Sequence, residues 1–240
     1  MKRFYTMVTV HHGLDGYLIH LDGKPVRTPM KQVLCTPHIT LAEAIRAEWA
    51  GQKDTIDVPA MRLTQILSTR LDRVSSERAA MTARLLPYLD TDLLCYRTDS
   101  PPDLAARQAA LWDPWLDWFA AQFSTPLATT FDLEALRQPA HLHHLIKTYI
   151  ESLNDDVFTV LQIITPAAGS LVLGLAFIAR AITPDQVMAA IRAEEGYKAI
   201  LYNEELHGPD PAQEAKDRAL RADIEAAACY LDLIGQPDEG

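Results

Sequence analysis

The chain has 240 residues, of which 48% are hydrophobic and 22% are charged, as is typical of a folded protein that buries a full core in one or two domains. A formal net charge of −10, with no basic stripe to offset it, disfavours binding to nucleic acid or to an anionic membrane surface. Three widely separated cysteines offer neither a disulfide framework nor a Cys-x-x-Cys metal or redox site, which fits a reducing compartment.

The first 36 residues are expected to form short antiparallel strands. Aromatic and aliphatic residues recur over residues 4–10 and 17–21. Asp22-Gly23 follows the second run and favours a tight hairpin, because both positions of that turn need a positive φ. Thr40 and Glu43 then match a capping box, which predicts one helix. We therefore predict a β-rich N-terminal domain with one helix over residues 1–60.

The rest of the chain, residues 61–240, is predicted to be an all-helical domain, because its apolar residues recur at helical spacing. Signals for a helix start occur at Ser75-Ser76 and Thr183-Pro184, and Asp113-Pro114 favours a new or kinked helix. The helix that begins after Thr183 is expected to run to about residue 206, and the last helix to span residues 212–234. The predicted fold class is thus α+β, a small β-rich N-terminal domain followed by an all-helical C-terminal domain.

Residues 157–179 contain no charged side chain and are long enough to cross a bilayer as a helix. Pro166 lies in the middle of this stretch and would break a helix there, because proline lacks the backbone donor. The pattern favours two buried helices joined around residues 165–169, with no membrane insertion. The N-terminus shows neither the apolar core of a secretory signal nor the pattern of a transit segment.

Residues 88–97 place Asp90, Asp92 and Arg97 inside a run of aromatic and aliphatic residues. A D-x-D pair can hold a divalent cation, which would suit a metal-dependent transferase or phosphohydrolase that uses Asp90 and Asp92. Buried acids can instead cap backbone donors and pair with an arginine, because an unpaired buried charge is very unfavourable. We interpret the three residues as a structural polar knot and keep the metal-dependent enzyme as the alternative.

Two further patterns do not amount to a cofactor site. His141, His143 and His144 share a helical segment, but no acidic residue or cysteine at a suitable spacing completes a metal-ligand set. Gly169 and Gly174 have the spacing of a phosphate loop, yet Leu175-Ala176 follow where Lys-Ser/Thr would be needed. We expect no metal, no nucleotide and no other cofactor.

Glu194 and Glu195 interrupt the apolar stripe of the helix that begins after Thr183. Glu194 can pair with Lys198 one turn later, an interaction of little energetic weight. The alternative is a carboxylate doublet presented to a partner protein. The charge pattern alone leaves both interpretations open.

Several stretches resemble one protein family. Residues 21–29 read LDGKPVRTP, similar to the family's LDGRPVRTP, and residues 47–52 read AEWAGQ, similar to its AEWxxQ. Residues 88–97 resemble its YxxTDLLCYR and residues 108–118 its QxxxWDPxLDW. The family is the assembly chaperone of F-type ATP synthase that binds the free α subunit, found in mitochondria and some bacteria. The likeness extends over about residues 4–202.

The resemblance implies a chaperone without a catalytic step, whose partner is the ATP synthase α subunit. The family's acidic contact patch would fall on Glu194 or Glu195, and the sequence departs from the family nearby, with Lys198 and Tyr202-Asn203 in place of Gln and Trp-Gly. We expect the chaperone to cover an apolar surface of free α until α pairs with β. We also expect a monomer when free, located in a bacterial cytoplasm.

Overall fold

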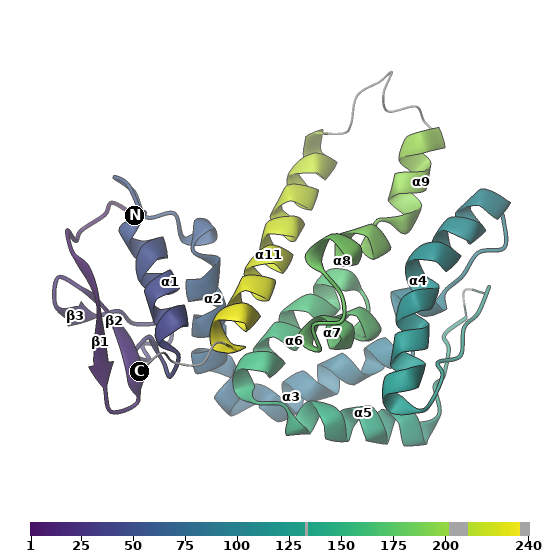
Figure 1. The fold of residues 1–240 in the computed structure, drawn as a ribbon, viewed down its shortest axis with the longest axis horizontal. Coiled ribbons are helices and arrows are strands. Elements are labelled where there is room, and N and C mark those ends of the chain that lie inside the picture. The colour runs from purple at the N-terminus through teal and green to yellow at the C-terminus, as the bar shows by residue number, and fades with distance from the viewer. Residues whose placement is uncertain (133, 202–210, 236–240) are drawn as a thin grey trace. The chain divides into compact units, whose positions relative to one another are not determined.

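A computed structural model describes residues 1–132, 134–201 and 211–235, and it confirms the predicted α+β fold, with a small sheet near the N-terminus followed by helices (Figure 1). The chain divides into two compact units. Unit 1 consists of Met1–Arg78, Asn154–Val160 and Ala226–Gly240, and unit 2 of Ala79–Leu153 and Leu161–Glu225. The domain boundary near residue 60 stays a prediction, because packing units do not test which segments fold independently.

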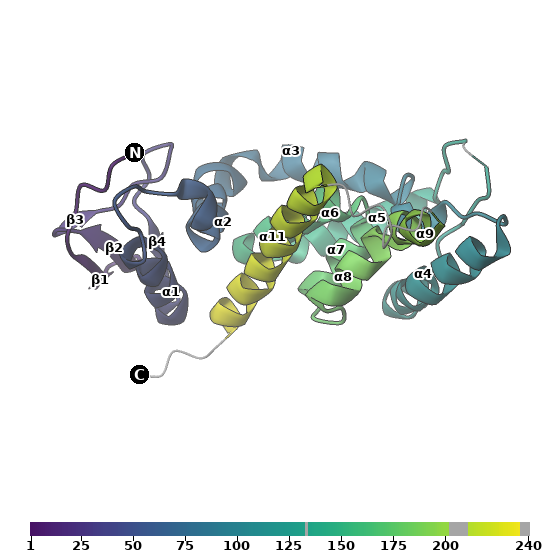
Figure 2. The same cartoon turned by 90° about the horizontal axis from the view of Figure 1, so that it is seen from above.

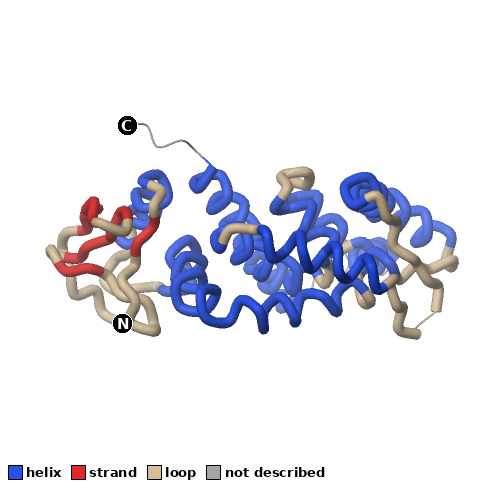
Figure 3. Tube along the Cα trace, turned by 90° about the horizontal axis from the view of Figure 1, so that it is seen from below, coloured by secondary structure: helices blue, strands red, loops and turns tan. Residues whose placement is uncertain are grey.

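Unit 1 contains the sheet, and all of its strands lie within the first 36 residues (Figures 2 and 3). The strands are β1 (Val8–Gly13), β2 (Gly16–Leu21), β3 (Lys24–Pro25) and β4 (Cys35–Thr36). Strand β2 pairs antiparallel with each of the other three, and its Ile19 lies opposite Val10 of β1. The hairpin predicted at Asp22-Gly23 is confirmed, since Asp22 has φ 47° and Gly23 has φ 79°.

Helix α1 (Ile39–Ala50) packs against β1, β2 and β4, and the residues between them are fully buried, with Ile19, Leu41 and Ile45 all at 0% exposure. The predicted capping box is wrong. The helix already begins at Ile39, so Thr40 lies inside its first turn and cannot act as the cap. The hydroxyl of Thr40 instead donates to the carbonyl of Leu233 at 2.6 Å.

The helical segment that follows α1 is continuous from Arg62 to Leu85, whereas the sequence suggested a new start at Ser75-Ser76. The short helix η1 (Val58–Ala60) precedes it, and it consists of α2 (Arg62–Thr69), the π-helical η2 (Arg70–Val74) and α3 (Ser75–Leu85). An α-helix begins at Ser75 as predicted, but the serines do not cap it, because Ser75 has helical backbone angles and continues η2 directly into α3. The hydroxyls of Ser75 and Ser76 donate to the carbonyls of Leu71 and Arg73 in the preceding turn. Serine that bonds backward in this way is compatible with a helix interior.

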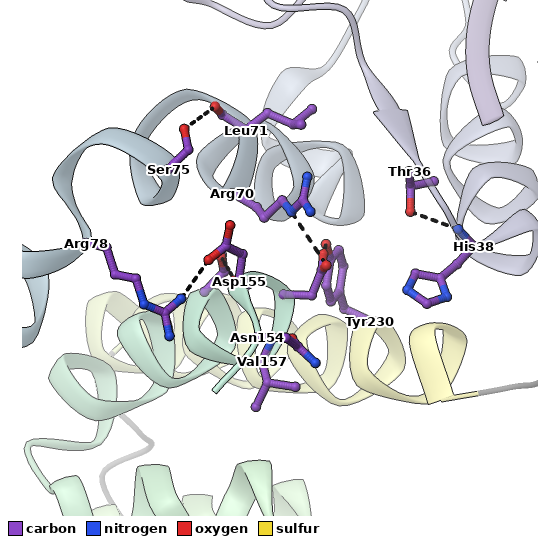
Figure 4. Close-up of polar contacts among 12 residues, drawn as sticks. Thr36, His38, Arg70, Leu71, Ser75, Arg78, Asn154, Asp155, Val157 and Tyr230 are labelled. Atoms are coloured by element: carbon purple, nitrogen blue, oxygen red, sulfur yellow. Dashed lines mark hydrogen bonds and ion pairs between the residues drawn. The ribbon is translucent and has the colours of Figure 1, made fainter. Parts of the chain in front are cut away.

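A polar cluster in unit 1 joins segments that are far apart in the sequence (Figure 4). It is centred on Asp155 and Asp156 in the first turn of α6 (Asp155–Ala168). Arg78 Nη1 lies 2.6 Å from an oxygen of Asp155, and Arg70 Nε lies 3.5 Å from an oxygen of Asp156. The hydroxyl of Tyr230, in α11 (Pro211–Gly235), donates to Asp156 at 2.5 Å. Burial raises the pKa of Tyr230, so the phenol stays protonated as the donor.

Unit 2 is helical and is organised around α4 (Pro102–Phe123) and α7 (Leu171–Ile178). Its other elements are η3 (Leu86–Leu89), η4 (Leu93–Cys95), α5 (Ala140–Ser152), α8 (Pro184–Ile191) and α9 (Ala193–Leu201). Helix α4 runs unbroken through Pro114, so the helix start predicted at Asp113 is wrong. The carboxylate of Asp113 forms an ion pair with Arg97 and therefore does not serve as a cap.

The charge-free stretch over residues 157–179 is divided between two helices as predicted, but the break lies at Gly169 and Ser170 and not at Pro166. Helix α6 contains Pro166 in its last turn, Gly169 follows with φ 63°, and α7 begins after Ser170. The hydroxyl of Ser170 accepts from the backbone N–H of Leu173 at 3.0 Å. In the part of the chain that the structure describes, no helix combines the length and apolar character needed to cross a membrane.

Candidate partner-binding site

Glu194 and Glu195 lie in the first turn of α9, directly after a break in the helical segment. The capping box predicted at Thr183 is present and starts α8, with Thr183 and Gln186 bonding each other's backbone. The helix was expected to continue to about residue 206, but it stops at Ile191, and Arg192 has φ −96° and ψ 19°. The acidic doublet therefore follows a corner between two short helices.

Side chains of α4 hold this corner in place, since α4 packs beside both α8 and α9 (Figures 1 and 2). The indole Nε1 of the buried Trp112 donates to the carbonyl of Ala190 at 2.9 Å. Arg107 Nε donates to the carbonyl of Ala193 at 2.8 Å. A side chain at Gly196 would clash with the guanidinium of Arg107, because an added Cβ would lie 2.6 Å from its nitrogen. Three backbone positions around the break, Ala190, Ala193 and Gly196, thus lie against side chains of α4.

The two glutamates have different surroundings. The amide of Gln108 donates to a carboxylate oxygen of the half-buried Glu194 at 3.0 Å, and its own oxygen accepts from the backbone N–H of Thr98 at 2.8 Å. Glu195 is exposed, and within the described residues it has no hydrogen bond or ion pair. Glu194 is therefore part of the α4 contact, whereas Glu195 is exposed to solvent. Tyr202 and Asn203, and the side chain of Lys198, lie outside the described residues.

Asp92 is completely buried, and its carboxylate accepts hydrogen bonds from backbone N–H groups of η4 and α7. One carboxylate oxygen accepts from the N–H of Leu94 at 3.1 Å, and the other accepts from the N–H of Val172 at 3.0 Å. Burial raises the pKa of Asp92 to about 6, and hydrogen bonds from Ser170 and the backbone partly oppose that rise. The carboxylate thus caps the N-termini of η4 and α7 together.

Asp90 and Arg97 belong to separate networks. Asp90 lies 3.0 Å from Nε2 of His143 and accepts from the backbone N–H of Gln138 at 2.8 Å. Arg97 pairs with Asp113, and its guanidinium lies 5.5 Å from the ring centre of Trp112. Among the residues described, no bond joins Arg97 to Asp90 or Asp92. The three predicted residues are all structural in their contacts, but they do not form one knot.

The same contacts bear on the metal-dependent alternative. Both oxygens of Asp92 accept from backbone N–H groups, and the side chain is 0% exposed, so the carboxylate offers no access to a hydrated cation. Over the described ranges, no group of three or more His, Cys, Asp or Glu side chains could hold a metal ion. His143 contacts Asp90 rather than the neighbouring histidines.

Comparison with known proteins gives the family. The model of the ATP12 chaperone protein family matches residues 2–120. Atp12 from Paracoccus denitrificans, known from a crystal structure, is 33% identical in sequence to this chain. The alignment covers 97% of each chain, and the two structures superpose with a TM-score of 0.87. The chain belongs to the ATP12 chaperone family. The resemblance found in the sequence motifs is thereby confirmed.

Two further solved structures agree with this assignment. A mutant of P. denitrificans Atp12p is 33% identical, covers 97% of both chains and has a TM-score of 0.86. The Atu1473 protein of Agrobacterium tumefaciens is 31% identical, covers 97% of this chain and 86% of its own, and has a TM-score of 0.86. The likeness to the ATP12 family therefore includes the helical part that carries the α8–α9 corner.

The residues that position this corner carry no clear signal of that role in the sequence. Gln108 and Trp112 belong to a motif that resembles the family pattern, but nothing in their spacing indicates that they bond residues 190–194. The signal that was present is the polar Gln108 on an apolar helical face, and its burial to 1% exposure means that it must have bonding partners.

Proposed function

We propose that the protein is an assembly chaperone that binds the free α subunit of the F-type ATP synthase head and prevents its aggregation until α pairs with β. Membership of the ATP12 chaperone family supports this proposal. Covering an exposed apolar interface reversibly requires binding but no chemical step, so the protein acts without catalysis or cofactor. It is a monomer when free and acts in a bacterial cytoplasm, and the bacterial sources of the solved relatives support that location.

The observation that carries the proposal is the exposed carboxylate of Glu195 on a corner that α4 fixes. A rigidly presented charge contributes more to binding than one on a flexible segment, because less conformational entropy is lost. In the proposed complex Glu195 contacts the α subunit directly. Glu194 supports the contact by holding α9 against Gln108.

The test is capture of free α subunit by the purified chaperone, together with suppression of α aggregation. Glu195→Lys should weaken capture by about tenfold or more, because it reverses a charge at the contact. Asp117→Lys is the matched control, since Asp117 is an exposed acid on α4 of the same unit, and it should behave as wild type. Wild-type protein that neither captures α nor slows its aggregation would refute the proposal.

A further inference from the structure

One segment of unit 1 is locally basic. Residues 24–34 contain Lys24, Arg27 and Lys31 and no Asp or Glu. Unit 1 as a whole contains 11 Lys and Arg against 13 Asp and Glu, a net charge of −2, so the basic character belongs to this segment and not to the unit. The proposed contact at Glu195 lies in unit 2 and gives no role to the basic segment. A local cluster of one charge sign marks a surface that prefers the opposite charge.

Unit 1 contains a groove that the proposed contact does not use. It has a volume of about 590 Å³, and it lies between the segment 26–34 and the helices α2 and η2. We call it the hairpin groove. Its apolar wall consists of Val26, Pro29, Met30, Leu34, Trp49, Val58 and Met61. This size is within the range of cavities that bind a small ligand or one or two side chains of a partner.

The mouth of the hairpin groove exposes apolar side chains to water. Met30 is 63% exposed and Val58 is 53% exposed, whereas Met61 deeper in the groove is only 2% exposed. Methionine at such a mouth adapts its shape to different apolar partners. Exposed apolar side chains around a concave wall are typical of a surface that a partner covers.

The polar groups of the hairpin groove determine which charge it accepts. The carboxylate of Asp72 is already used, because it accepts from Thr28 Oγ1 at 2.5 Å and from the N–H of Met30 at 3.0 Å. Two cations line the groove: Arg73 forms an ion pair with Glu77 at 2.9 Å, and the exposed Arg27 donates one bond to the carbonyl of Lys31 at 2.8 Å. The groove therefore combines an apolar wall with the cation of Arg27 at its mouth, and its one acid already accepts two internal hydrogen bonds.

We propose that the hairpin groove is a second docking site for the client protein, and that it takes a client segment in which apolar side chains alternate with acidic ones. The apolar side chains enter between Met30 and Met61, and the acidic ones meet Arg27 at the mouth. This inference rests on the proposed function, because the client is the chaperone's partner. It also assigns a role to residues 26–29 of the LDGKPVRTP stretch, which line the groove.

The six methionines of the chain provide a direct test. Methyl NMR of the full chain labelled at the methionine methyl groups is titrated with a peptide of alternating Leu and Glu, and with a matched peptide of Leu and Lys. The signals of Met30 and Met61 should shift with the Leu/Glu peptide only, and the signal of the exposed Met7, outside the groove, should not. Unchanged Met30 and Met61 signals, or equal shifts with both peptides, would overturn the proposal.

Matched substitutions then connect the groove to the client. Met30→Glu and Arg27→Glu should each lower the affinity for the Leu/Glu peptide by about tenfold. Both substitutions should also reduce capture of free α subunit. Met7→Glu and Lys24→Glu alter exposed residues of the same unit that do not line the groove. These two variants should bind the peptide and capture the α subunit as wild type does. If wild type captures no α subunit at all, the proposed function fails, and the peptide titration alone still decides whether the groove binds.

Discussion

At the scale of single residues, Asp92 is the residue on which most local structure depends. Its carboxylate caps η4 through Leu94 and α7 through Val172, so one side chain satisfies donors from two segments about 80 residues apart. The arrangement tolerates a fully buried acid because hydrogen bonds replace the water that burial removes.

Replacing Asp92 by Asn should destabilise the protein by about 1–3 kcal/mol at pH 7. The amide NH₂ of asparagine would face one of the two backbone N–H groups, which leaves that donor buried without an acceptor. Urea unfolding followed by circular dichroism measures the effect. Asp99→Asn, at an exposed position, is the control and should stay within about 0.5 kcal/mol of wild type.

The stabilities of wild type and Asp92→Asn should depend differently on pH. Burial raises the pKa of Asp92 in the folded state to about 6, above the value of 3.8 for a free aspartate. Between these values the folded state binds more protons than the unfolded state, so stability increases as the pH falls. From pH 7 to pH 4.5 wild type should gain about 2 kcal/mol relative to Asp92→Asn, which does not titrate. A stability difference that is constant with pH, or that shrinks on acidification, would contradict this account.

Sequence alone identified residues 88–97 as a polar segment in an apolar environment, but it could not supply the partners. Asp90 bonds His143 and Gln138, about 50 residues away in the chain, and Arg97 bonds Asp113. Composition shows that a buried acid needs partners, whereas the fold decides which donors come within reach. The sequence therefore indicated which polar residues lie in an apolar environment, but not which residues they bond.

At the scale of elements, local signals located most helices but misplaced their interruptions. Pro166 did not break a helix as predicted, because it lies inside α6; the helix ends two residues later, before Gly169, which adopts the positive φ that few other residues tolerate. Pro114 lies inside α4, and Ser75 continues η2 directly into α3 with helical backbone angles, so neither residue follows a break in the helical chain. No local signal marked the break at Arg192, which is held by bonds from Arg107 and Trp112 on α4.

The α8–α9 corner should therefore loosen when its bonds from α4 are removed. Trp112→Phe deletes the bond to the carbonyl of Ala190 and leaves a space in the core, which should destabilise the protein by about 2 kcal/mol. Hydrogen exchange of the amides at Glu195 and Gly196 should become faster. Trp118→Phe on the same helix is the control, because Trp118 is only half-buried, and it should leave exchange in α9 unchanged.

At the scale of the whole molecule, residues of the family motifs hold backbone segments in place. Glu48 of the AEWAGQ stretch accepts from the backbone N–H groups of Leu63 and Thr64 at 2.8 Å each, and so caps α2. Asp92 caps α7 in the same way, and Gln108 holds the α8–α9 corner. An assembly chaperone needs a shaped surface and no reactive group, so motif residues that fix the backbone are consistent with that role.

If the client contacts both the acidic corner and the hairpin groove, the two sites should contribute independently. Glu195→Lys and Met30→Glu lie in different units and share no partner, so their effects on the free energy of binding α subunit should add within about 0.5 kcal/mol. Isothermal titration of wild type, both single variants and the double variant measures this. Both sites also rely on charge, so raising the salt concentration should slow association with wild type more than with the double variant. A double variant no weaker than Glu195→Lys alone would mean that the client does not use the groove.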